Sequence, residues 1–442
     1  MKIKDIGITV TGKTPSTKNS DNFDGDISFF TPEDIAKGYV LDQSLRHISE
    51  VGFQSIKNNT LDGISILVGC IGSDMGNVAL TKSRCATNQQ INSITRIKKE
   101  INPYYVYYYL SMRKKYLRKL AGSTTTPLLP KSVFEEIEIP LPQKRNQDKI
   151  ASFLTSIDDK RVLNEKINIQ LESMVKTLYD YWFLQFEFPN EDGKPYKSSG
   201  GKMVYNEQLK KEIPEGWEVV ELGSQIMENE KSSIQVNMVD NKGDIPFFTS
   251  GEDVLLCNKK MVTGLNIYMS TGGNATIKIY DGDAAYSTDT WCINNGEYTL
   301  FYYLYLMLIK QQINDNYFEG SGLKHLKKDA LKKILLYLPN KDILKKYNNV
   351  CLSYFKLISK NTLENRELSS LRDFLLPLLM NGQVTIKDAE EKVAEVIKIN
   401  DKAFGKDENF ELWLQNQGLA ARGDVDLQTL REIFDAMDED DK

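Results

Sequence analysis

Amide and cationic side chains gather in one stretch of the first half of this chain. Lys82 and Arg84 lead into Asn88, Gln89 and Gln90. An Asn or Gln amide can pair with adenine through two hydrogen bonds, while Arg and Lys can bind guanine or a phosphate. A single loop of this kind is more typical of a solvated surface, so these residues are candidates for base contacts and no more.

Polar loops of the same kind recur in both halves of the chain. Hydroxyl-rich or cationic stretches occur at 12–18, 122–126 and 322–328, and Lys278 lies in a Gly-rich strand-turn-strand stretch. Their recurrence at matching places in two domains favours DNA binding. The candidate DNA-binding residues are Lys13, Lys18, Lys82, Arg84, Asn88, Gln89, Gln90, Lys278, Lys324, His325 and Lys327.

Residues for catalysis or cofactor binding are sparse. The two histidines, His47 and His325, lie in different halves without metal-ligand spacing, which argues against a zinc site or a His-dependent hydrolase. The sequence has no P-loop, and Gly69, Gly72 and Gly76 lie between two predicted strands, as turn glycines do. We therefore expect no catalytic residue, no cofactor and no metal.

The segment Asn102-Pro103-Tyr104-Tyr105 partly matches one catalytic motif. Adenine methyltransferases use a similar motif, but its second proline is missing here and no Gly-rich loop for the methyl donor is evident. Asn102 suits a helix N-cap and Pro103 the first helical position. The start of a Tyr-rich helix explains these residues better than a methyltransferase site does.

Charge and cysteine content set further limits. The net charge is −5, but residues 401–442 hold 12 acidic and 5 basic side chains, so the rest of the chain is nearly neutral and can carry a basic face. Five scattered cysteines without a CxxC pair favour free thiols in a reducing cytoplasm. We expect no signal peptide, and the longest apolar stretch, 300–309, is too short to cross a membrane.

A long internal repeat organises the chain. Gly25–Thr31 (GDISFFT) returns as Gly243–Thr249 (GDIPFFT), and a Tyr-rich segment, a Gly-Ser loop and a last strand closed by proline also recur. A repeat this long indicates a duplicated domain rather than a solenoid. Each half is predicted to contain short strands with Gly, Asn and Asp turns, then a helix and a final strand. The expected fold is α+β, with two duplicated mixed α/β domains.

Helical periodicity follows each domain. From Ile150 to Tyr181 and from Val350 to Leu378, seam residues alternate at spacings of three and four, which is typical of a coiled coil. Each seam contains one asparagine, Asn164 or Asn361, and a lone buried Asn costs stability but fixes register. We expect two helices of roughly 30 residues, about 45 Å long, forming an intramolecular coiled coil. Alternatively, each seam packs on its own domain.

Several motifs together resemble the specificity (S) subunits of type I restriction-modification systems, over roughly residues 5–387. They are GKTPS (12–16), GDISFFTPEDI (25–35), CATNQQINSI (85–94), IEIPLPQKRNQDKIASFLTSIDDK (137–160), GWEVVELGS (216–224) and LENRELSSLRDFLLPLLMNGQV (363–384). The resemblance implies two target-recognition domains that each read half of a split DNA sequence, and two antiparallel helices that set their separation. It also implies methyltransferase (M) subunits docked on the helices and a restriction/translocase (R) subunit.

The sequence departs from this family in three places. The first domain lacks the opening found at Gly216-Trp217, the second has only a weak NQQ-like match at 287–290, and the tail past about residue 400 lies outside the resemblance.

Pro377 is expected to kink or end the second helix, with Asn381-Gly382 as its C-cap. The predicted domains are a first target-recognition domain (1–145), a first spacer helix (146–187), a linker (188–212), a second target-recognition domain (213–342), a second spacer helix (343–382) and an acidic C-terminal extension (383–442).

We therefore expect a non-catalytic cytoplasmic subunit that binds double-stranded DNA in the major groove. It would direct partner adenine methyltransferase and restriction subunits to a bipartite target. Two alternatives remain open: a coiled-coil scaffold that does not read bases, and a stand-alone DNA adenine methyltransferase that uses the motif at Asn102.

Overall fold

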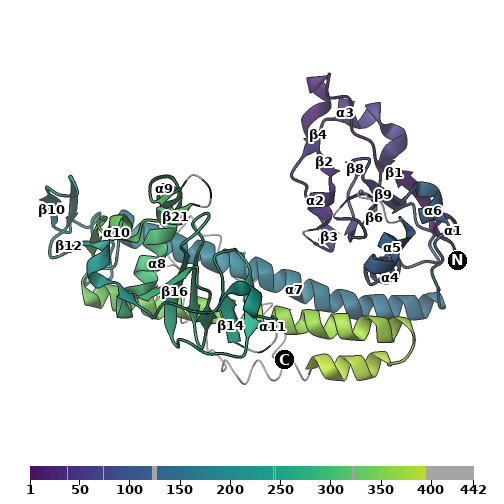
Figure 1. The fold of residues 1–442 in the computed structure, drawn as a ribbon. Coiled ribbons are helices and arrows are strands. Elements are labelled where there is room, and N and C mark those ends of the chain that lie inside the picture. Colours follow the sequence, from purple (N-terminus) through teal and green to yellow (C-terminus); the bar gives the residue numbers. More distant parts are fainter. Residues whose placement is uncertain are drawn as a thin grey trace. The chain divides into compact units, whose positions relative to one another are not determined.

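Figure 1 shows the computed structural model, which describes residues 1–394 except 37, 73, 122–126, 242, 244, 321 and 323. The described chain forms two compact units: unit 1 comprises Met1–Glu165 and the described residues from Thr362 onward, and unit 2 comprises Lys166–Asn361. The hydroxyl-rich loop predicted at 122–126 and most of the acidic extension lie outside the described residues.

Unit 1 contains two sheets, with strand orders β1-β9-β6-β7-β3 and β4-β2-β8-β5. Its strands are β1 (Ile8–Thr11), β2 (Phe23–Phe30), β3 (Val40–Leu41), β4 (His47–Ile48), β5 (Thr60–Leu61), β6 (Ser65–Gly69), β7 (Val78–Thr81), β8 (Cys85–Thr87) and β9 (Ile91–Thr95). Its short helices are α1 (Ile3–Ile6), α2 (Pro32–Ile35), α3 (Glu50–Ser55), α4 (Pro103–Ser111), α5 (Lys114–Leu120) and α6 (Lys131–Glu135). Strands β6, β7 and β9 are buried along their whole length, so they form the centre of the unit.

Unit 2 repeats this plan with a four-stranded sheet of order β13-β19-β16-β17 and a three-stranded sheet of order β15-β14-β18. Its strands are β10 (Met203–Asn206), β11 (Lys211–Pro214), β12 (Glu218–Glu221), β13 (Met227–Glu228), β14 (Ile245–Phe248), β15 (Val254–Cys257), β16 (Leu265–Ser270), β17 (Ile277–Asp281), β18 (Ala285–Tyr286), β19 (Thr290–Asn294), β20 (Phe318–Glu319), β21 (His325–Leu326) and β22 (Leu335–Leu338). Its short helices are α8 (Thr299–Leu308), α9 (Lys310–Asn316) and α10 (Lys328–Leu331). The predicted duplication of a mixed domain is confirmed.

The duplicated GDI-FFT motif contributes a strand to each unit, and the aromatic end of that strand is buried. Phe29, Phe30, Phe247 and Phe248 are all buried. In unit 1 the strand pairs in parallel with β8, and in unit 2 it pairs in parallel with β18. The aromatic residues of the motif therefore build the core, and the motif carries no chemistry of its own.

The Tyr-rich helix α4 begins as predicted from its capping residues. The Asn102 side chain accepts hydrogen bonds from the backbone amides of Tyr104 and Tyr105, with Pro103 at the first helical position. Its amide nitrogen donates to Asp148 Oδ1 at 2.6 Å. Because both ends of the Asn102 amide are engaged, this side chain is not placed to grip an adenine.

Two long helices follow the predicted heptad seams. They are α7 (Lys144–Tyr179), which continues into a π-helical turn at Asp180–Leu184, and α11 (Lys341–Met380). With 36 and 40 residues they are longer than the roughly 30 expected. Pro377 lies inside α11 and does not end it. The helix ends at a C-cap in which Gly382 has φ +68° and the amides of Gly382 and Gln383 donate to Leu379 and Leu378.

The long helices pair antiparallel within each unit. In unit 1, Asn164 of α7 donates to Glu364 and Asn365 of α11, and Asp158, earlier in α7, pairs with Arg372, later in α11. In unit 2, Asn361 donates to Asn168 at 2.8 Å, and Tyr347 donates to the carbonyl of Val175. The intramolecular antiparallel coiled coil is thus confirmed, and Asn164 and Asn361 are both buried in it.

Candidate DNA interface

Strand β8 separates the first cluster of candidate residues into two groups. Lys82 and Arg84 precede the strand, while Asn88, Gln89 and Gln90 follow it. The two groups therefore lie at opposite ends of a three-residue strand. They do not form the single surface that their closeness in sequence suggests.

Arg84 is committed to a contact within unit 1. Its guanidinium binds both carboxylate oxygens of Glu50 at 2.8 Å and lies 3.9 Å from the centroid of the Phe53 ring. The hydrogen bond to Glu50 raises the pKa of Arg84, and the same contact lowers the pKa of Glu50. This arrangement favours a structural role for Arg84. Arg84 and its neighbour Lys82 are both exposed.

The β8–β9 loop (Asn88–Gln90) is held by its backbone and by its neighbours. The Asn88 amide donates to Phe30 O at 3.1 Å, and the Cys70 amide donates to Gln90 O at 2.8 Å. The Asn88 side chain donates to Gln90 Oε1 at 3.0 Å and accepts from the Gln90 amide. The loop therefore presents a fixed set of amides, with Gln89 the most exposed of the three.

The 12–18 loop joins the β8–β9 loop at one edge of unit 1. Thr14 Oγ1 donates to Gln89 Oε1 at 3.0 Å, and the Gly12 amide donates to Ile91 O. A Cβ at Gly12 would lie 2.1 Å from Asn88 O, so glycine is required for this close approach. Lys13 and Lys18 are exposed on the same loop. The structure thus brings the loop that carries Lys13 next to Gln89 and Gln90, although the two segments are far apart in sequence.

Unit 2 holds an equivalent loop on the same backbone framework. The Ser287 amide donates to Phe248 O at 2.9 Å, and the Thr271 amide donates to Asp289 O at 2.9 Å. These two bonds match those of Asn88 and Cys70 in unit 1. The β18–β19 loop (Ser287–Asp289) therefore occupies the position of Asn88–Gln90, and Asp289 stands in the place of Gln90.

A second pair of segments is equivalent in the same way. In unit 1 the Gly72 amide donates to Pro127 O, and in unit 2 the Gly273 amide donates to Lys324 O. Isolated bridges join Ile71 to Leu128 and Gly272 to His325. Lys324 and His325 are exposed. The contacts of Gly272 and Gly273 place them beside the β16–β17 turn, whose Thr271 binds the β18–β19 loop. The weak NQQ-like match in the second domain is thus a real structural equivalence.

Two other candidates in unit 2 are engaged by the protein. Lys278 Nζ is half-buried and donates to the carbonyls of Thr249, Gly251 and Asp253. Burial lowers the pKa of Lys278. Lys327 is exposed but forms an ion pair with Glu319. Sequence reasoning missed Thr288 and Asp289 as candidates, and their alignment with the NQQ motif was the signal that could have found them.

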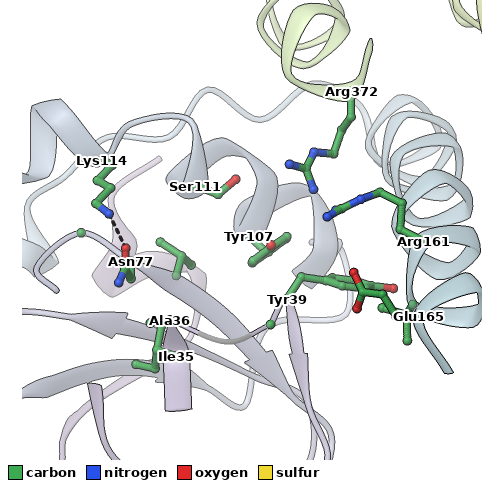
Figure 2. A pocket seen from close by; sticks show the side chains of 14 residues that line it. Ile35, Ala36, Tyr39, Asn77, Tyr107, Ser111, Lys114, Arg161, Glu165 and Arg372 are labelled. Carbon is green, nitrogen blue, oxygen red and sulfur yellow. Dashed lines mark hydrogen bonds between the residues drawn. The ribbon is translucent and has the colours of Figure 1, made fainter. Parts of the chain in front are cut away.

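Unit 1 also contains a pocket of about 360 Å³ against the long helices (Figure 2). Arg161 and Arg372 point into it, above Tyr107. Both guanidinium groups bind Asp158, which is fully buried and also accepts a hydrogen bond from Tyr108. These contacts join α4 to α7 and α11. The cluster of Tyr108, Asp158, Arg161 and Arg372 therefore has a structural role.

The described part of the chain offers neither a metal site nor a membrane span. No group of three or more His, Cys, Asp or Glu there is arranged to hold a metal ion. Nor does any helix among these residues have the length and apolar character needed to cross a membrane. All five cysteines are buried free thiols.

The family model for the type I restriction modification DNA specificity domain matches residues 1–173 and 214–372. The chain belongs to this family. Its role is therefore DNA-sequence recognition in a type I restriction-modification system, with catalysis in other subunits. The two matched ranges each contain one of the equivalent loops described above.

Known specificity subunits are similar to most or to part of this chain. The MjaIX specificity subunit of Methanocaldococcus jannaschii is 28% identical over 417 residues, covering 88% of this chain and 93% of that protein. The HindI specificity subunit of Haemophilus influenzae is 33% identical over 174 residues, covering 36% of this chain and 37% of that protein. The crystal structure of an S subunit from M. genitalium aligns with a TM-score of 0.57 at 15% identity, over 86% of this chain and 95% of that one, which confirms the fold.

Proposed function

We propose that each unit of this specificity chain reads one half of a bipartite DNA target through its equivalent loop. One observation carries the proposal: the same backbone hydrogen bonds hold Asn88–Gln90 in unit 1 and Ser287–Asp289 in unit 2, while the side chains differ completely. A constant framework with variable polar side chains is what base readout requires, because side chains in the major groove distinguish all four base pairs.

The side chains of the two loops favour different bases. Gln89 and Gln90 carry amides, which pair best with adenine. Asp289 is exposed and can accept a hydrogen bond from the N4 amino group of cytosine. Lys13, Lys18 and Lys324 are exposed cations beside these loops, suited to phosphate or guanine. The two half-sites are therefore expected to differ in sequence.

The proposed function also includes partner subunits and a location in the cell. We infer that methyltransferase subunits dock on the paired helices α7 and α11 and that a restriction/translocase subunit joins them, because the related proteins are specificity subunits of type I restriction enzymes. At 1.5 Å per residue, α7 is about 54 Å long, enough to separate half-sites by one DNA turn of about 34 Å. Five unpaired buried thiols support a cytoplasmic location.

The experiment is an exchange of residues 1–140 for the corresponding segment of a related specificity subunit. Methylated adenines are then mapped in cells that also carry the partner subunits. We expect one half of the methylated sequence to change and the other half to stay. A chimera that assembles with its partners but methylates the original sequence would show that unit 1 is a scaffold and not a reader.

A further inference from the structure

An unusually basic segment follows the sheets of unit 1. Residues 101–134 contain no Asp or Glu and six cations. These are Arg113, Lys114, Lys115, Arg118, Lys119 and Lys131. The corresponding segment of unit 2, residues 297–331, has four cations and four acidic residues. The two domains therefore differ sharply in charge at one place in a shared fold.

Helix α5 carries most of this charge and is fixed in orientation. Leu117 is fully buried beneath it, Lys114 donates to Asn77 Oδ1, and Arg118 Nε donates to Met75 O at 3.2 Å (Figure 2 shows the Lys114 bond). Lys115 and Lys119 are one turn apart and exposed. The bonds of Lys114 and Arg118 thus anchor the helix, and Lys115 and Lys119 face solvent.

Helix α5 and the β8–β9 loop border the same turn of unit 1. The turn runs from Cys70 to Asn77, between β6 and β7. Its first residue donates to Gln90 O, whereas its end contacts α5 through Met75 and Asn77. A DNA duplex seated on the loop would therefore pass close to a helix with exposed lysines.

The cations of unit 2 are largely neutralised in comparison. Lys327 pairs with Glu319, and Lys332 pairs with Glu228. Lys310, in the helix α9 that corresponds to α5, lies 3.8 Å from Glu252. An ion pair offers less attraction to a phosphate than an uncompensated lysine does.

We propose that Lys115 and Lys119 of α5 bind the DNA phosphate backbone beside the first half-site, so that unit 1 supplies more of the sequence-independent affinity than unit 2. This inference rests on the proposed DNA-reading function and assigns that function a surface. Phosphate contacts release counterions, and each one steepens the salt dependence of binding by about 0.9 in log K against log[salt]. Specificity is left to the two loops.

The test compares K115A/K119A with K98A/K99A in the complex with its partner subunits. Lys98 and Lys99 are also exposed in unit 1, but they follow β9 at the end opposite to the β8–β9 loop. Binding to a duplex without the target sequence is measured between about 50 and 200 mM salt. We expect K115A/K119A to reduce the slope by about 1.8 and the control to leave it unchanged.

The possible outcomes distinguish this inference from the proposed DNA-reading function on which it rests. Methylation mapping of K115A/K119A should give the original target sequence, because phosphate contacts carry no sequence information. An unchanged slope, or an equal fall in the control, would overturn the role of α5 even if the loops read bases. Loss of partner subunits on purification with an unchanged slope would mean that α5 binds protein instead. Thermal unfolding of both variants verifies that they are folded.

Discussion

Asn164 of α7 donates a hydrogen bond of 2.9 Å to the carboxylate of Glu364 on α11, and both side chains are buried. Asn164 also donates to Asn365, whose own amide donates to Arg161 O. The asparagine thus satisfies a buried acidic group, and its predicted role in fixing the register of the helices stays a prediction. This contact lies within unit 1 and explains why a polar residue interrupts an apolar seam.

Asn164→Leu should lower the free energy of unfolding by about 1–3 kcal/mol, because it leaves the buried Glu364 without its amide donor. Asn361→Leu should cost about 1 kcal/mol, since it removes one hydrogen bond between two neutral amides, that of Asn361 to Asn168. Urea unfolding measures both. Gln170→Leu, at an exposed position of α7, is the control. A stability of Asn164→Leu equal to that of the control would contradict the assigned role.

Replacement of Gln89 and Gln90 by alanine should relax the half-site read by unit 1. Loss of a bidentate base contact is worth about 1–3 kcal/mol of discrimination. Arg84→Ala is the matched comparison, because Arg84 is held by Glu50 and should leave the methylated sequence unchanged. Methylation mapping of both variants tests this prediction. If the methylated target sequence changed in Arg84→Ala alone, Arg84 and not the two glutamines would be the base-reading residue.

Asp289→Asn should alter the half-site read by unit 2 and leave the other half intact. The change replaces an acceptor-only carboxylate with an amide, which favours adenine over cytosine. Asp283→Asn serves as control, since Asp283 is bound by Lys260 and Thr263 in another turn of the same unit. The proposal fails for this residue if both variants methylate the same sequence as the parent chain.

Asp158→Asn should destabilise unit 1 by about 3–5 kcal/mol, because Arg161 and Arg372 would lose their shared buried partner. Burial and the nearby Asp158 raise the pKa of Tyr108, so this phenol stays a neutral donor to the carboxylate. Asp159→Asn, at the exposed neighbouring position, should have a much smaller effect. Equal unfolding midpoints for the two variants would argue against the structural role of Asp158.

The thiols should react slowly in the native chain. Burial raises the pKa of Cys70 to about 11 and that of Cys85, Cys292 and Cys351 to about 12, so little thiolate forms near pH 8. Labelling with a disulfide reagent should be slow without urea, and all five thiols should react in urea. One thiol that reacts in the native chain as fast as free cysteine would contradict this prediction.

Local patterns in the chain were enough to predict much of the fold. The repeat of GDI-FFT predicted duplicated domains, and spacings of three and four predicted long paired helices, because burial of one helix face imposes that period. Asn102 and Gly382 were recognised as caps from residue type alone. Pro377 was harder to interpret, since packing of the surrounding helix overrode its tendency to end a helix.

The candidate site depended on contacts that no local pattern contains. Residue types identified amides and cations, but only the folded chain placed Arg84 against Glu50, enclosed Lys278 in carbonyls and brought the loop that carries Lys13 beside Gln89. The equivalence of Asp289 with Gln90 likewise rests on backbone hydrogen bonds between strands far apart in sequence. The sequence by itself therefore determined the duplicated architecture and the family. Tertiary structure decided which polar side chains remain available for DNA, because availability depends on the partners that folding brings to each one.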